Sequence, residues 1–64
     1  MDNARPNPLL DHCAKMHAKE AVENGLFACE MAAKGNASAA AHFARIACRE
    51  ANALNLVLAV SGGN

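Results

Sequence analysis

The sequence predicts an all-α fold in which two long helices form an antiparallel hairpin. Apolar and small residues recur every three to four positions through most of the 64-residue chain, which is the period of an amphipathic helix. A helix-start signal stands at Asn7-Pro8, and a helix-stop signal at Gly35-Asn36 divides the periodic stretch in two. We therefore expect helices at about residues 8–34 and 37–60, within a single small domain.

The first helix is expected to be continuous. Asn7 can accept a hydrogen bond from a free N–H of the first turn, and Pro8 suits the first helical position, where no N–H is needed. Asn24-Gly25 could end a helix or form a β-turn, but the apolar periodicity passes through this dipeptide without a change of phase. Gly35 can adopt the left-handed conformation that ends a helix. One helix of about 27 residues, roughly 40 Å long, follows from these signals.

The second helix, capped by Ser38 or Asn36, carries apolar residues spaced alternately by three and four, the pattern of a heptad seam. This seam and the alanine-rich stripe of the first helix are predicted to pack together. The residues predicted to form the core of the hairpin or of a dimer are Leu10, Ala18, Val22, Phe43, Ala47, Glu50, Leu54 and Val57.

Glu50 is the one charged member of the predicted seam, and a lone carboxylate is costly to bury. In an antiparallel hairpin it should face residues 18–25, so Asn24 is the first choice of partner, and His17 lies about one turn beyond. Two interpretations stay open. The carboxylate either fixes the register at the edge of the interface or marks a place for a ligand or for the basic group of a partner.

Sixteen of the 64 residues are alanine, so two helices alone bury little large apolar surface. A second apolar row on the first helix, which includes Cys13, lies outside the alanine stripe, and one hairpin cannot cover both. We expect two hairpins to dimerise into a four-helix bundle. Residues 1–6 are expected to form a flexible arm, and residues 61–64 a flexible tail.

The predicted function is that of a small, non-enzymatic interaction module, which binds and inhibits or regulates another protein through a helical face. Met and Phe are common on such adaptable surfaces, and arginine side chains suit their rim. The predicted partner-binding residues are Leu9, Met16, Phe27 and Met31 as apolar anchors, with Arg45 and Arg49 as rim charges. No catalytic residue is predicted, because a mid-helix cysteine such as Cys13 lacks the free N–H groups that lower a thiol pKa.

Two alternatives remain open. Cys13, Met16 and His17 are soft ligands, and Cys13 and His17 share a helix face at a spacing of four, so a bundle could bind Cu(I) or Zn. The repeated cysteine spacing typical of helical copper-storage proteins is missing, and the main prediction therefore includes no metal and no cofactor. The second alternative is a structural homodimer with no specific partner.

Composition argues against several other classes. Six basic and six acidic residues give no net charge, and two aromatic residues make no base-stacking platform, so nucleic-acid binding is not expected. The most apolar stretch, residues 53–60, is far shorter than the roughly 20 residues that cross a bilayer, so no membrane is expected as a partner. Three cysteines without a CxxC pair indicate a reducing compartment, and the start of the chain does not resemble a secretory signal. A cytoplasmic location is predicted.

Overall fold

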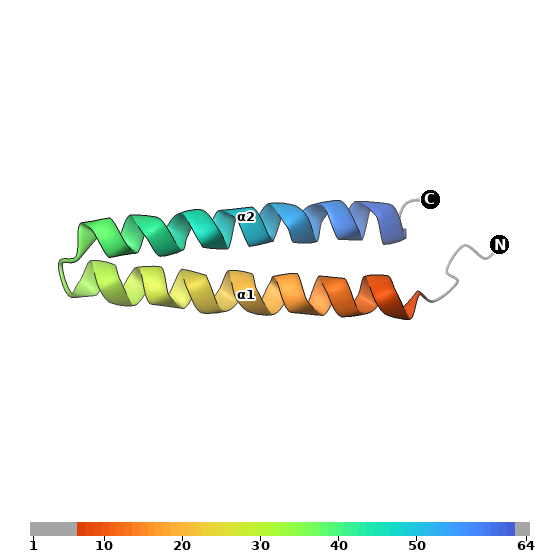
Figure 1. Cartoon of the computed structure of the whole chain (residues 1–64), viewed down its shortest axis with the longest axis horizontal. Coiled ribbons are helices and arrows are strands. Elements are labelled where there is room, and N and C mark those ends of the chain that lie inside the picture. Colours follow the sequence, from red (N-terminus) through yellow and green to blue (C-terminus); the bar gives the residue numbers. More distant parts are fainter. Residues whose placement is uncertain (1–6, 63–64) are drawn as a thin grey trace.

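The computed structural model describes residues 7–62, which form two helices joined by a short turn (Figure 1). Helix α1 covers Pro8–Ala33 and helix α2 covers Ala37–Gly62. The helices lie side by side and antiparallel, so the start of α1 and the end of α2 are at the same end of the hairpin (Figure 1). The predicted all-α hairpin is confirmed. Ser61 and Gly62, expected in a tail, continue α2, whereas residues 1–6 and 63–64 lie outside the described residues.

Asn7 caps α1 as the sequence predicts. Its side-chain Oδ1 accepts a hydrogen bond from the backbone N–H of Leu10 at 3.2 Å, and Pro8 occupies the first turn. The backbone N–H of Asp11 donates to the carbonyl of Asn7 at 2.9 Å, which is the first bond of the helical ladder. The cap satisfies an N–H group that has no partner within the helix.

The turn is closed by a left-handed glycine. Gly35 has a φ of +80°, and its N–H donates to the carbonyl of Ala32 at 3.0 Å. The N–H of Asn36 donates to the carbonyl of Met31 at 2.8 Å, which completes the Schellman motif that ends α1. The Oδ1 of Asn36 then accepts the N–H of Ala39 at 3.1 Å. Of the two predicted caps for α2, Asn36 rather than Ser38 makes this bond.

Helix α1 runs through Asn24-Gly25 without a break, as the periodicity predicts. The side-chain amide of Asn24 donates to the carbonyl of Glu20, one turn earlier, at 2.8 Å. The acceptor is the carbonyl four residues earlier, as it is for a backbone N–H in an α-helix. The Asn24 side chain is therefore satisfied within α1, and the helix continues past it. Asn24 is also the one buried residue of the described part, with 9% of its surface exposed.

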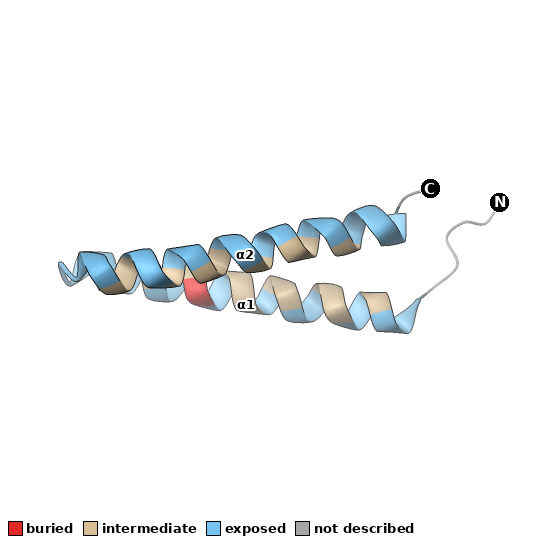
Figure 2. Cartoon of the chain, turned by 45° about the horizontal axis from the view of Figure 1, so that its top comes forward, coloured by how far each residue is buried: buried red, intermediate tan, exposed pale blue. Residues whose placement is uncertain are grey.

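The contact between the helices consists of half-buried residues along their facing sides (Figure 2). Within residues 7–62 no apolar residue is fully buried. On α1 the contact centres on residues spaced by seven, namely Leu10, His17, Asn24 and Met31. On α2 it follows the predicted heptad seam, which comprises Ala40, Phe43, Ala47, Glu50, Leu54 and Val57.

Val22, predicted for the core of the hairpin or of a dimer, does not lie on this contact between α1 and α2. Its side chain is 62% exposed. The position is two residues from Asn24, which is about 160° around the helix. Met31, by contrast, is half-buried against α2 instead of standing on a free apolar row, and so is Cys13. The face that α1 presents to α2 is therefore rotated away from the centre of the alanine stripe and toward the row that contains Met31.

The two internal glycines predict opposite effects of alanine. At Gly35 the positive φ strains any L side chain, so Gly35→Ala should lower the free energy of unfolding by about 1 kcal/mol. At Gly25, a helical position where an added Cβ has no atom of α2 and no side chain beyond its chain neighbours within 4 Å, Gly25→Ala should raise it by about 0.5–1 kcal/mol. Urea unfolding followed by circular dichroism measures both variants, and effects of the same sign would contradict this account of the turn.

Candidate interaction surface

The seam divides the hairpin surface into two long faces, because helical residues project about 100° apart. Here the first is named the mixed face, and its side chains lie to one side of the seam, from Phe27 beside the seam to Arg45 on the outer side of α2. Part of the mixed face is formed by α1 and part by α2, and in this antiparallel pair both parts lie on the same side of the hairpin. The mixed face consists of Leu9, Met16, Glu23, Phe27 and Glu30 on α1 and of Arg45, Arg49, Leu56 and Val60 on α2.

The mixed face carries most of the large hydrophobic side chains that the described hairpin leaves exposed. Of the eight such residues, five lie here, and three of these are well over half exposed: Leu9 at 70%, Leu56 at 67% and Val60 at 71%. Leu9 and Met16 are near the open end of the hairpin, at the level of Val60 and Leu56 on α2. The open end of this face is therefore apolar on both helices.

The position of the Phe27 ring is set by a second aromatic ring. Phe27 lies on the α1 edge of the mixed face and is 47% exposed. The centroid of its ring is 5.3 Å from that of Phe43 on α2, with the planes tilted by 45°. Phe43 in turn is 5.3 Å from the His42 ring in an edge-on arrangement. Such aromatic pairs contribute about 0.5–1.5 kcal/mol each, so Phe27 is held in place while one side of its ring stays accessible.

Five of the six predicted partner-binding residues are exposed on the mixed face, and the sixth, Met31, is half-buried on the seam. The sequence analysis did not include Leu56 and Val60, because it considered only the heptad seam of the second helix as apolar. A spacing signal was present. Arg45, Arg49, Leu56 and Val60 follow one another at intervals of four, seven and four, which places all of them on one side of a helix.

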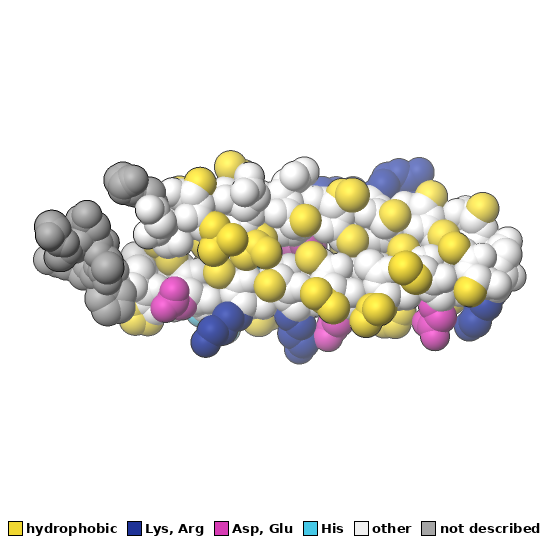
Figure 3. All heavy atoms as spheres, turned by 180° about the vertical axis from the view of Figure 1, so that it is seen from behind, with side chains coloured by type: hydrophobic (Ala, Val, Ile, Leu, Met, Phe, Trp, Pro, Cys, Tyr) yellow, Lys and Arg dark blue, Asp and Glu magenta, His cyan; other side chains and the backbone are white. Residues whose placement is uncertain are grey.

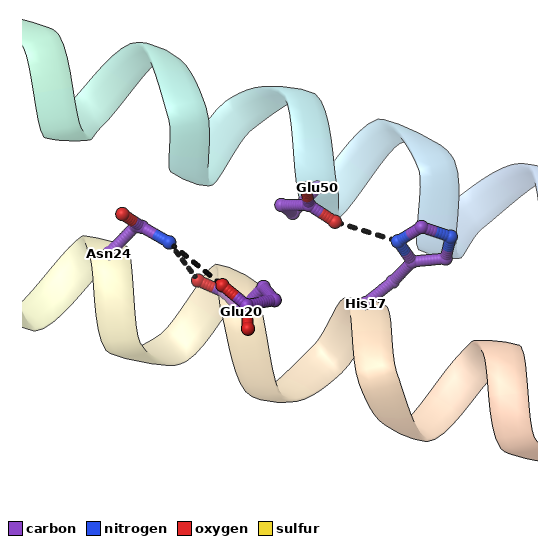
Figure 4. A network of polar contacts seen from close by, with 4 residues as sticks. All are labelled: His17, Glu20, Asn24 and Glu50. Atoms are coloured by element: carbon purple, nitrogen blue, oxygen red, sulfur yellow. Dashed lines mark hydrogen bonds and ion pairs between the residues drawn. The ribbon is translucent and has the colours of Figure 1, made fainter.

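Glu50 pairs with His17 across the hairpin. Glu50 Oε1 lies 2.7 Å from His17 Nδ1, and the two side chains are 29% and 34% exposed (Figure 4). The prediction that Asn24 is the first-choice partner of Glu50 is therefore wrong. The amide of Asn24 is already bonded within α1, which leaves the imidazole as the polar group that meets the carboxylate (Figure 4).

The His17–Glu50 pair fixes the alignment of the two helices along their length. Packing alone holds this contact weakly against sliding, because no apolar side chain within residues 7–62 is fully buried. A hydrogen bond of 2.7 Å between residues 33 positions apart is lost when either helix moves by one turn. Because both groups are about a third exposed, solvent screens the interaction, and its contribution to the free energy of folding is small. Its main effect is to fix the alignment of the two helices.

The three residues of the alternative metal site do not converge. Cys13 and His17 are half-buried on the seam, whereas Met16 is 43% exposed at the edge of the mixed face. His17 Nδ1 is engaged with Glu50. Among the residues that the structure describes, no three His, Cys, Asp or Glu side chains are grouped so that they could hold a metal ion.

No protein-family model, curated protein or solved structure matches the chain. Between residues 7 and 62, neither helix has a stretch long and apolar enough to span a bilayer. The function of the mixed face is therefore inferred from its own residues.

A double-mutant cycle on His17→Ala and Glu50→Ala should give a coupling energy of about 0.5–1 kcal/mol, because each single change already removes the cross-helix bond. The same cycle on His12 and Glu30, both exposed and far apart on α1, is the control and should give none. Chemical unfolding of the four proteins in each cycle provides the measurement. Equal coupling in the two cycles would show that the pair does not hold the helices together.

Proposed function

We propose that this chain is a non-enzymatic interaction module that binds another protein through the mixed face and thereby inhibits or regulates it. The observation that carries the proposal is the gathering of five large exposed hydrophobic side chains on one face. Within the described residues, this occurs in a hairpin that buries no apolar residue fully. Apolar surface rimmed by charged groups is typical of protein-binding sites.

The charges on this face favour a partner helix with acidic residues along one edge. Arg45 and Arg49 are exposed, and the only ion pair within residues 7–62 is His17–Glu50, so both guanidinium groups are available. Arginine binds carboxylates through two parallel hydrogen bonds. Glu23 on the opposite edge repels acidic groups, which orients the partner with its acidic side toward α2. Leu9, Met16 and Phe27 then face the apolar side of the bound helix.

We also propose that two hairpins associate into a four-helix bundle in the cytoplasm. The three cysteines of the chain are free, which fits the reducing compartment that the sequence predicts. Association would bury apolar side chains that each hairpin leaves half-covered. The alternative function, a structural homodimer with no specific partner, has the same assembly. It differs only in that no other protein binds its mixed face.

Site-specific photo-crosslinking in the source cells tests the function. A benzoylphenylalanine residue placed at position 16 or 27 should give a discrete adduct with one other protein. The same probe in place of Lys19, which is exposed on the outer side of α1, is the matched control and should give none. Adducts that contain only a second copy of the chain would support the structural homodimer, and identical patterns from all three positions would refute a specific mixed face.

Charge reversal should weaken binding of the cross-linked partner through loss of the rim contacts. We expect Arg45→Glu combined with Arg49→Glu to raise the Kd at least about tenfold, which corresponds to roughly 1.4 kcal/mol. Lys15→Glu combined with Lys19→Glu changes the net charge equally on the outer side of α1 and should leave the Kd within about twofold. Isothermal titration at two salt concentrations measures both, and an equal loss in the two variants would indicate a non-specific charge effect.

A further inference from the structure

The face opposite the mixed face has a different character and is here named the alanine face (Figure 3). On α1 it includes Ala18, Val22 and Gly25, and on α2 it includes Ala44, Ala51 and Leu58. Hydrophobic side chains follow both helices in this view, while the charged side chains of α1 gather along its outer edge (Figure 3). Val22 is 62% exposed and Leu58 52%, so the face is more than a row of methyl groups.

The geometry points to a second copy of this chain as the occupant of the alanine face. This inference rests on the dimerisation proposed above and identifies the surface through which it occurs. The two copies meet with their alanine faces together, related by a twofold axis, and both mixed faces remain outward.

Charge distribution is the first argument for this occupant. On α2, the side chains between the seam and the outer edge of the alanine face are Ala44, Ala47, Ala51, Asn55 and Leu58, none of which is charged. On α1 the face carries Asp11 and Lys15 near the open end, in line with Gly25 and Val22, and its centre is uncharged. A face with an uncharged centre offers little to attract a strongly charged partner, and it can close on itself without burying an ion in the middle of the contact. Closing the mixed face on itself would instead bury Arg49 and Glu23 at the contact.

The size of the face is the second argument. A helix of 26 residues is about 39 Å long at roughly 1.5 Å per residue. Two packed helices present a width of about 18 Å, since their axes lie roughly 8–10 Å apart. Each copy therefore contributes about 700 Å², or about 1,400 Å² for the pair, which lies within the range of about 1,200–2,000 Å² that stable, specific interfaces bury.

Shape provides a third argument. Small residues such as Ala18, Ala44 and Ala51 let helices of two copies approach closely, which strengthens dispersion contacts. The larger Val22 and Leu58 stand between these small positions. A twofold axis places such side chains of one copy against the small positions of the other, so the same surface serves both partners. The resulting dimer is bivalent, because it presents two mixed faces to its targets.

Sedimentation equilibrium on matched arginine variants tests the assignment. Wild-type protein should have the mass of a dimer. Ala44→Arg combined with Ala51→Arg places charges at two exposed positions of the alanine face and should give a monomer. Leu56→Arg places a charge at an exposed position of the mixed face and should remain a dimer. The reverse result, a dimeric alanine-face variant and a monomeric Leu56→Arg protein, would overturn the assignment while dimerisation itself stands.

A milder pair of variants guards against loss of folding. Val22→Ser combined with Leu58→Ser should raise the dimer dissociation constant at least tenfold, while Leu9→Ser on the mixed face should leave it within twofold. Unchanged dimer affinity in the first variant would contradict the inference. A wild-type chain that is monomeric at every concentration would refute both the assignment and the dimer. Cross-linking from position 27 is independent of these results and continues to test the partner-binding proposal.

Discussion

The incomplete burial of apolar side chains between the two helices is the constraint on which the rest of this structure depends. The contact joins a few large side chains to alanines on both helices, and each methyl group contributes far less than the roughly 1.5–3 kcal/mol of a fully buried leucine. Within residues 7–62 no apolar side chain is fully buried, and eight large ones are exposed. The hairpin therefore has two apolar outer faces in place of a core, and its stability and function both depend on what covers them.

The polar residues at the centre of the seam have a role that follows from the same constraint. Asn24 is buried and bonded within α1, and His17 bonds to Glu50 across the hairpin. Where apolar side chains are only half-buried, packing holds the helices weakly against sliding, so a cross-helix hydrogen bond helps to select one alignment. This selection places Phe27 beside Phe43 and brings Leu9 to the level of Val60, which assembles the mixed face from both helices.

Local signals in the sequence were enough to predict the hairpin, whereas the rotation of its helices was not predictable. Asn7 and Gly35 act within one turn of the backbone, so their roles could be read directly and are confirmed. The rotation of α1 depends on which side of a broad alanine stripe meets α2, and periodicity leaves this open when so many positions are small. For this reason the sequence does not show that Val22 lies off the contact between α1 and α2, and spacing alone favours Asn24 over His17 as the partner of Glu50 because it does not reveal that the Asn24 amide bonds within its own helix.

The most direct test of the central claim is the concentration dependence of thermal unfolding. If a hairpin needs a second copy to complete its apolar contacts, mass action stabilises the folded state as the concentration rises. A hundredfold increase then contributes roughly 2.7 kcal/mol, which corresponds to a rise in Tm of about 10 °C for a dimer of this size. Circular dichroism at both concentrations gives the answer. A Tm that does not change would show that the single hairpin is stable alone and would contradict the account.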